Sequence, residues 1–250
     1  MRHKRIIVTR YGGPDELQVV EEECPEPKNG EVRVRVLAAG VSLPDVMARE
    51  GVHPETPPVP FTPGWDLVGV VDLLGNGTSG VEPGQTVAAL PIHGAYAEFV
   101  CLPQRELVPV PSGLDVAEAV SLVLNYITAY QMLHRSAKVR SGRRVLIHGA
   151  AGGVGTAAFG LCIAAGWLLP GRKRVVPYSI QTLKRLKPEL FRQDLIALLD
   201  LLKQRKIKPL IAQRFPLAEA RQAHELLGKG GVTGKFVLMC NESSLESAAA

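Results

Sequence analysis

The chain has 250 residues, of which 46% are hydrophobic and 21% charged, a composition that is typical of a globular protein and not of a disordered one. An aromatic content of 5% argues against a stacking surface for single-stranded nucleic acid. The net charge of +5 is spread over short basic clusters at residues 1–5, 172–174 and 203–208 without a nucleic-acid motif around them, so we expect no nucleic-acid partner.

The first third of the chain is expected to form short β-strands, because β-branched residues alternate or cluster between Gly and Pro turns. The expected strands cover residues 6–8, 17–20, 31–36, 67–71, 86–90 and 97–100. Strands of this length and spacing suggest a barrel or a sandwich. Residues 116–134 then change to a helical period, with Asp115 as the expected N-cap and no Gly or Pro inside.

The second half of the chain is expected to mix strands and helices. A buried parallel strand is predicted at residues 143–148, followed at once by a glycine-rich turn and a helix at 154–165. Residues 174–180 are a candidate second strand. The remaining expected elements are amphipathic helices at 189–204 and 217–227 and a strand at 234–239.

Residues 149–171 carry no charge and are numerous enough to cross a bilayer. The glycines at the start of this stretch, together with Gly166 and Pro170, leave only about 10 to 12 residues of continuous helix. That length favours a buried core helix, so we expect no membrane partner. Membrane association through this stretch remains an alternative.

The four cysteines, at positions 24, 101, 162 and 240, are far apart and form no CxxC pair. This spacing predicts neither a disulfide framework nor a zinc knuckle, and a reducing cytoplasm is the expected location. The histidines form no HxxH or HExxH pair either. The apolar residues behind the basic N-terminus are too few for the core of a signal peptide.

Ala150-Ala-Gly-Gly-Val-Gly155 is the most informative segment, because an apolar stretch precedes it and an uncharged helix follows. Such a turn lets backbone N–H groups and the positive helix end approach a pyrophosphate. Ala150 stands at the first glycine position of the G-x-G-x-x-G pattern. The context favours dinucleotide binding over a merely tight structural turn.

Several segments together resemble quinone-oxidoreductase-like members of the medium-chain dehydrogenase/reductase superfamily. The first is the turn itself, Ile147-His-Gly-Ala-Ala-Gly-Gly-Val-Gly155. The others occur in the family's order, at residues 40–51, 61–71, 84–88, 125–130 and 234–238. The resemblance therefore covers nearly the whole chain.

This resemblance implies a fold of the α/β and β class, with a GroES-like β-barrel catalytic domain and a Rossmann-like parallel sheet domain. On that basis we expect the barrel at residues 1–122, a shortened nucleotide-binding domain at 123–206 and a return segment at 207–250. The family's catalytic cleft lies between the two domains. A homodimer is the expected assembly, on the family's pattern alone.

The same resemblance argues against zinc. The zinc alcohol dehydrogenase branch has a Cys where this sequence has Ser42 and a His where it has Trp65, and its four-Cys lobe is missing here. Neither a hydroxyl nor an indole replaces a thiolate and an imidazole as zinc ligands. What the resemblance implies instead is direct hydride transfer from NADPH to a quinone or an activated double bond.

By motif position, the family pattern assigns cofactor contacts to Asn125 and Thr128 at the nicotinamide, to Gly152, Gly153 and Val154 at the pyrophosphate, and to Lys235 from the returning segment. Ser42 and His53 replace the family's common Asn and Tyr on the substrate side. With Asn125, they are the candidate catalytic residues.

Each of these residues also has a purely structural interpretation. Thr128 could bond to its own helix, Asn125 could be a satisfied buried amide, and Lys235 could be a solvated charge at a strand edge. His53 could be a cleft contact or an exposed loop residue. For Asp45 and Arg49, a helical i,i+4 pair is favoured over a catalytic role.

A complete Rossmann sheet needs about 150 residues, but the chain has only 64 between positions 143 and 206. In one explanation, residues 174–180 are the second strand of an abbreviated sheet, and Ser179, Lys184 and Arg185 meet a 2′-phosphate. In the favoured explanation, residues 167–180 resemble the last Rossmann strand, next to the dimer interface, and the strands between are absent. The expected consequence is weakened cofactor binding.

The leading hypothesis is therefore a zinc-independent, NADPH-dependent quinone or enone reductase with an internally shortened nucleotide domain. The rival hypothesis is a catalytically inactive relative that acts as a binding or dimerising module. Consumption of NADPH with a small quinone distinguishes the two.

Overall fold

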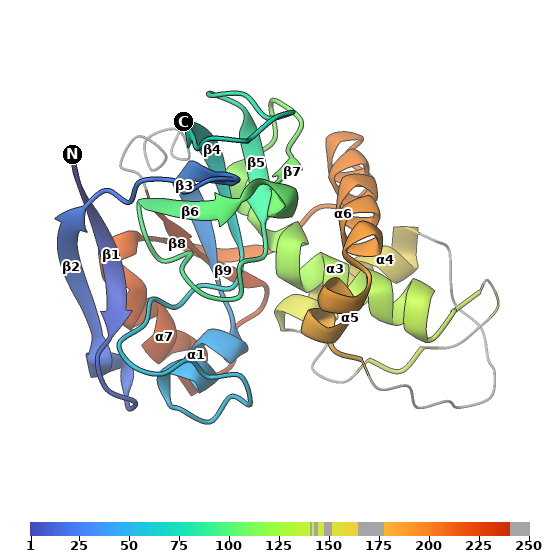
Figure 1. Ribbon diagram of the computed structural model, residues 1–250. Coiled ribbons are helices and arrows are strands. Elements are labelled where there is room, and N and C mark those ends of the chain that lie inside the picture. Colours follow the sequence, from blue (N-terminus) through green and yellow to red (C-terminus); the bar gives the residue numbers. More distant parts are fainter. Residues whose placement is uncertain (141, 143–144, 148–151, 165–177, 241–250) are drawn as a thin grey trace.

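The computed structural model describes residues 1–140, 142, 145–147, 152–164 and 178–240. Within these residues, a curved seven-stranded sheet forms one part of the molecule. A group of helices packs against one end of that sheet (Figure 1).

The sheet is organised around β3 (Glu31–Val41), because its first half is buried at every second residue and its last four residues are all buried. On one edge, β3 pairs with β4 (Leu67–Leu74), which in turn pairs with β5 (Thr86–Ala89) and, through it, β7 (Val108–Pro109). On the other edge, β6 (Phe99–Pro103) pairs with the first half of β3 and β9 (Lys235–Met239) with the second half. The C-terminal strand β9 thereby returns to the N-terminal sheet.

Two further strand pairings complete the β part. β8 (Ile211–Pro216) runs parallel to β9. β1 (Arg2–Val8) and β2 (Leu17–Glu23) form an antiparallel ribbon beside the sheet. Two isolated bridges, Arg5 to Ala97 and Val8 to Phe61, fasten this ribbon to the loops of the sheet.

Two helices, α1 (Leu43–Arg49) and α7 (Ala220–Lys229), contact each other on one side of the sheet. Between them and the ribbon lies a hydrophobic cluster that includes Val34, Leu67, Phe215 and Leu238. α1 follows β3 directly, so it holds the residues just after the central strand in place.

A continuous helical run links the sheet to the remaining helices. It comprises α2 (Val116–Ser121), the π-helical η3 (Leu122–Tyr126), α3 (Ile127–Tyr130) and the π-helical η4 (Gln131–Ser136). Asp115 caps the start, because its Oδ1 accepts the Glu118 N–H at 2.9 Å. The predicted helix and its cap are confirmed. In proteins generally, π-helical segments inside a helix are often found at functional sites.

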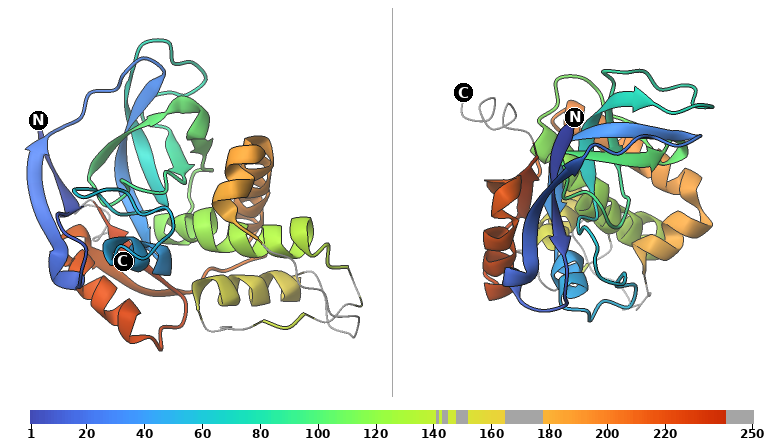
Figure 2. Two further views of the ribbon diagram at one scale, coloured as in Figure 1. Left: turned by 60° about the horizontal axis from the view of Figure 1, so that its bottom comes forward. Right: turned by 60° about the vertical axis from the view of Figure 1, so that its left-hand side comes forward.

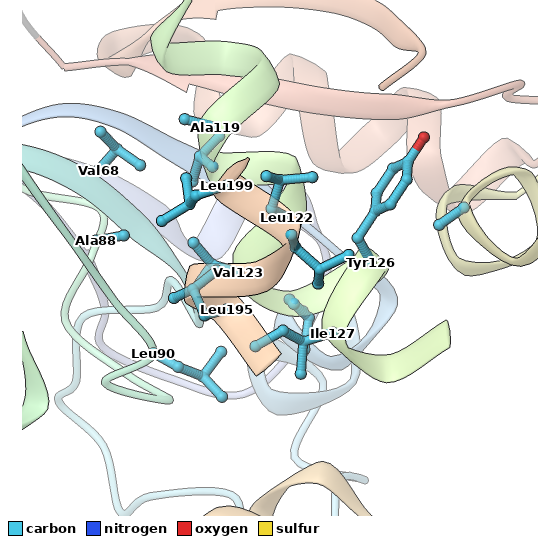
Figure 3. Packing of buried hydrophobic residues seen from close by; sticks show 14 of the residues in the cluster. Val68, Ala88, Leu90, Ala119, Leu122, Val123, Tyr126, Ile127, Leu195 and Leu199 are labelled. Carbon is cyan, nitrogen blue, oxygen red and sulfur yellow. The ribbon is translucent and has the colours of Figure 1, made fainter. Parts of the chain in front are cut away.

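The other helices pack against this run. α4 (Gly153–Ala164) lies beside α3, and α6 (Pro188–Lys203) crosses the run after the short α5 (Ile180–Leu186) (Figure 2). Figure 3 shows the resulting core, in which Val68 and Ala88 of the sheet, Val123 of the run and Leu195 of α6 meet. One apolar core thus joins the sheet to the helices.

Most elements expected from the sequence are present within a few residues of their predicted bounds. The strand expected at 97–100 is β6, which begins at Phe99. The short strand β7, the parallel strand β8 and helix α5 were not expected. The sequences of β8 and α5 contain polar and basic residues and show only weak apolar periodicity. The pattern of apolar residues therefore does not predict either element.

The two strands predicted for the nucleotide-binding part lie partly outside the described residues. Of residues 143–148, only Val145–Ile147 are described, and they form no strand. Of residues 174–180, Tyr178 and Ser179 are described as irregular, and Ile180 already belongs to α5. The uncharged stretch 149–171 is described only at 152–164, where α4 lies.

Among the residues that the structure describes, no helix combines the length and the apolarity that crossing a membrane requires.

Candidate functional site

The predicted glycine turn leads into α4, which begins at Gly153. Residues 148–151 of the turn lie outside the described part of the chain, but Gly152 is exposed at its end. The Thr156 hydroxyl donates to the carbonyl of Gly152 at 3.0 Å and closes the first helical turn. The first N–H groups of a twelve-residue helix carry the positive end of its dipole, which suits a phosphate.

Asn125 lies directly against this helix start. The side chain is 5% exposed on η3, and a Cβ added at Gly153 would collide with its Nδ2 atom. A side chain at position 153 would therefore displace the Asn125 amide from the start of α4. The structure brings together two of the predicted site residues, one expected at the pyrophosphate and one at the nicotinamide.

A largely apolar pocket of about 460 Å³ adjoins these residues. Gly152, Gly153, Val154 and Gly155 form one wall, and Ala129, Met132 and Leu133 of the helical run form another. The exposed Leu146 closes a third side. Its volume is within the range of small-ligand sites.

Thr128, expected near the nicotinamide, lies close enough to Tyr178 to affect the pKa of its hydroxyl. The Tyr178 hydroxyl in turn donates to Gln131 Oε1 at 2.8 Å, and Gln131 Nε2 donates to Asp194 at 2.9 Å. Burial raises the pKa of Tyr178, and the Thr128 hydroxyl lowers it by a smaller amount. This network, which joins the helical run to α6, was not foreseen, because its members are dispersed in the sequence.

Lys235 is 3% exposed, and its Nζ lies 3.2 Å from Asp66 Oδ2. Asp66 is fully buried, and a Cβ at Gly40 would collide with both side chains. The interpretation of Lys235 as a solvated strand-edge charge is therefore wrong, because β9 lies inside the sheet. Its predicted contact with the cofactor remains a prediction.

Ser42 caps α1 in contact with a second buried carboxylate, that of Asp45. Asp45 Oδ2 accepts the Ser42 N–H at 2.9 Å and its hydroxyl at 2.5 Å, while Oδ1 accepts the Gly64 N–H at 2.9 Å. Burial, and to a smaller extent the charge of Asp66, raise the pKa of Asp45 to about 7, against the effects of Ser42, Lys235 and Gly64.

The expected i,i+4 ion pair between Asp45 and Arg49 is wrong. Asp45 instead satisfies Ser42 and Gly64, and Arg49 Nη2 bonds to Glu50 Oε1 at 2.5 Å. Both residues are buried, so the capping geometry at the start of α1 takes precedence over the helical spacing.

His53 is half-buried and belongs to an aromatic cluster. Its ring meets the buried Trp65 edge to face, with centroids 5.3 Å apart, and Trp65 also meets His93 at 6.4 Å. The His53 Nδ1 accepts the Glu55 N–H at 3.2 Å. Burial lowers the pKa of His93, so its ring is neutral at physiological pH.

The candidate residues thus form four groups: Asn125 with the start of α4, Thr128 with Tyr178, Ser42 and Lys235 with two buried carboxylates, and His53 with Trp65. Sequence reasoning missed Asp66 and Tyr96. The sequence contains a signal for Asp66, because it is an ionisable residue directly before the apolar strand at 67–71. For Tyr96, whose pKa is raised by burial and by the carboxylates of Asp45 and Asp66, no pattern pointed to a site.

Comparison with known proteins extends these observations. The alcohol dehydrogenase GroES-like domain matches residues 28–112, and the zinc-binding dehydrogenase family matches residues 103–238. The mouse synaptic vesicle membrane protein VAT-1 homolog-like is 36% identical over 159 residues, which are 64% of this chain and 38% of that protein. Human quinone oxidoreductase is 34% identical over 170 residues, 67% of this chain and 52% of that protein.

The chain thus spans about two fifths to one half of the length of these curated relatives. Among solved structures, the human VAT-1 homolog-like protein superimposes with a TM-score of 0.85 at 26% identity, covering 97% of this chain and 99% of that one. A mycobacterial protein complexed with NADPH has a TM-score of 0.80 at 22% identity, covering 95% and 100%, and shows the fold alone.

A GroES-like sheet followed by a glycine turn and helix defines a medium-chain dehydrogenase/reductase. Within that superfamily, this chain belongs to the quinone-oxidoreductase-like members. The predicted fold class, a GroES-like part with a shortened Rossmann-like part, is confirmed.

The family description includes zinc, but the residues at the expected ligand positions do not fit it. The Ser42 hydroxyl donates to Asp45, and the Trp65 indole nitrogen is a donor only. In the described residues, no three His, Cys, Asp or Glu side chains gather in a way that could hold a metal ion. The Ser42 and Trp65 side chains therefore do not provide zinc ligands at these positions.

Proposed function

We propose that this chain is a zinc-independent oxidoreductase that holds the nicotinamide end of NADPH and reduces a quinone or an activated double bond. The contact between Asn125 and the glycine start of α4 carries the proposal, because it places an amide group directly behind a helix end that suits a phosphate and that lines a pocket. NADPH supplies a hydride to the substrate when it is bound.

The chain's own residues would orient the reactants. The N–H groups at the start of α4 would bind phosphate oxygens, and the Asn125 amide would hydrogen-bond to the nicotinamide carboxamide. Gly152, Gly153 and Val154 leave the backbone accessible from the pocket. The apolar walls would exclude water from the reacting ring.

The substrate side would be formed by Ser42 and His53. The Ser42 hydroxyl provides a polar contact, and the edge-to-face arrangement of His53 and Trp65 suits a flat conjugated ring. A quinone or an enone is such a substrate.

Binding of the adenosine half is expected to be weak. Only 15 residues, 165–179, connect the end of α4 to the start of α5. They are too few for the two or three strand–helix units on which the adenosine normally rests. The cofactor would therefore depend mainly on its nicotinamide end.

The test is a titration of NADPH fluorescence, followed by NADPH consumption with a small p-quinone. We expect Asn125→Ala to weaken NADPH binding about tenfold, as for the loss of one buried hydrogen bond. The control is Asn76→Ala, which removes an exposed loop amide. Absence of a saturable signal at millimolar NADPH, or equal effects of both variants, would contradict the proposal.

The second candidate is a catalytically inactive relative that acts as a binding or homodimerising module. The burial of Lys235 against Asp66 favours it, because that ammonium is already paired. Stable folding and dimerisation without NADPH consumption would support this alternative.

A further inference from the structure

We propose that a second pocket, remote from the glycine turn, binds a small carboxylate with an apolar body. This pocket has a volume of about 530 Å³ and lies between the sheet and helices α5 and α6. It shares no lining residue with the pocket at the start of α4. Its size falls within the range of small-molecule sites.

Three hydrogen bonds connect the walls of the pocket. The Lys184 Nζ on α5 donates to the Leu90 carbonyl at 2.6 Å and to Glu106 Oε2 at 2.8 Å. On α6, Arg192 Nη1 donates to the Leu107 carbonyl at 2.7 Å. These bonds join both helices to the segments that follow β5 and precede β7, so they hold the walls of the cavity in place.

The interior offers an apolar surface and an unused donor. Phe191 and Val108, both at most 3% exposed, line it together with Ile92. The buried Gln181 Nε2 has no hydrogen-bond partner, although it belongs to the lining. An unsatisfied buried N–H is unfavourable, so an acceptor in the cavity would stabilise it.

The charge around the pocket favours an anion. Arg105 and Arg185 line it, are exposed, and form no ion pair with any described residue. The Glu106 carboxylate is occupied by Lys184, which leaves Glu55 and Glu189 as the other acidic lining residues. Guanidinium groups bind carboxylates with two parallel hydrogen bonds, and Phe191 and Ile92 would contact the apolar body.

Ile92 supports a functional role for this wall. Its φ is +75°, in the left-handed region that β-branched residues avoid. Such strain is often retained at ligand sites.

The experiment measures binding of 2-naphthoate by calorimetry, without NADPH, so that its outcome does not depend on the proposed reductase activity. The neutral 2-naphthamide is the matched probe. We expect saturable binding of the carboxylate, about tenfold weaker binding of the amide, and a loss of about tenfold in both Arg105→Gln and Arg185→Gln.

Lys203→Gln, which removes an exposed charge at the far end of α6, should leave the affinity unchanged. Three results would overturn the proposal: no saturation at millimolar 2-naphthoate, equal affinity for the amide, or an equal loss in Lys203→Gln. Displacement of 2-naphthoate by adenosine 2′-phosphate would instead assign the pocket to the nucleotide and equally overturn it.

Discussion

At the scale of single residues, the buried charges behind the central strand are the most unusual feature. Asp45 and Asp66 are both at most 1% exposed. Lys235, the first residue of β9, is the cation that pairs with Asp66. The backbone of Gly40 leaves room for this arrangement. Breaking a buried ion pair exposes the full desolvation cost of the remaining charge.

We therefore expect Lys235→Met to lower the free energy of unfolding by about 3 kcal/mol, because it leaves Asp66 without its cation. Urea unfolding measures this loss. Lys203→Met makes the same change at an exposed site and should cost less than about 0.5 kcal/mol. A similar small effect for both variants would show that Lys235 does not stabilise Asp66.

The pKa of Asp45, raised to about 7, predicts a pH dependence of stability. The unfolded carboxyl titrates near pH 3.9, so between about pH 4 and pH 7 the folded state binds more protons. The stabilising effect of this group is complete below about pH 4 and decreases as the pH rises through 7.

In Asp45→Asn this dependence should disappear. His224, whose pKa is lowered to about 3 mainly by burial, acts in the opposite direction but is common to both proteins. From pH 4 to 7, the free energy of unfolding of the parent should therefore fall relative to that of the variant, by at most about 4 kcal/mol. A difference that does not vary with pH, measured by urea unfolding, would contradict this assignment.

At the scale of elements, the helical run from α2 to η4 connects the sheet to helices α4 and α6. Its start is fixed twice, because Asp115 Oδ1 accepts both the Glu118 N–H and, from β8, Arg214 Nη2 at 2.9 Å. The run also carries Asn125, so the position of the candidate site depends on it.

Asp115→Ala removes the cap and the ion pair, and we expect a loss of about 1 to 2 kcal/mol in the free energy of unfolding. Asp115→Asn keeps a capping oxygen and loses only the charge, so it should cost less than half as much. Thermal unfolding of both variants provides the comparison. Equal losses would assign the effect to the ion pair with Arg214.

The sequence predicted this run, its cap and most strands, because apolar periodicity and turn residues act locally. It did not predict the contact of Ser42 with Asp45, three residues away, because Asp45 was expected to pair with Arg49 instead. It did not predict the residues beside Lys235 and Thr128, because these come from distant segments. The Asp45–Arg49 spacing was misleading for the same reason: Gly64, 19 residues away, provides the contact that decides the position of Asp45.

At the scale of the whole molecule, one core extends from Val68 and Ala88 in the sheet to Leu195 and Leu199 in α6. Helix α6 therefore packs on the sheet directly (Figures 1 and 3). The chain retains the start of a nucleotide-binding domain together with the helices that normally end it. The pocket at the start of α4 is the site that we propose for the nicotinamide end, and only 15 residues, 165–179, separate α4 from α5.

The most direct test compares the affinities of NADPH and of reduced nicotinamide mononucleotide, which lacks the adenosine half. If only the nicotinamide end is held, both should bind, with dissociation constants within about threefold of each other. Asn125→Ala should weaken both equally. Binding of NADPH more than about a hundredfold tighter than the mononucleotide, or binding of neither, would contradict the account.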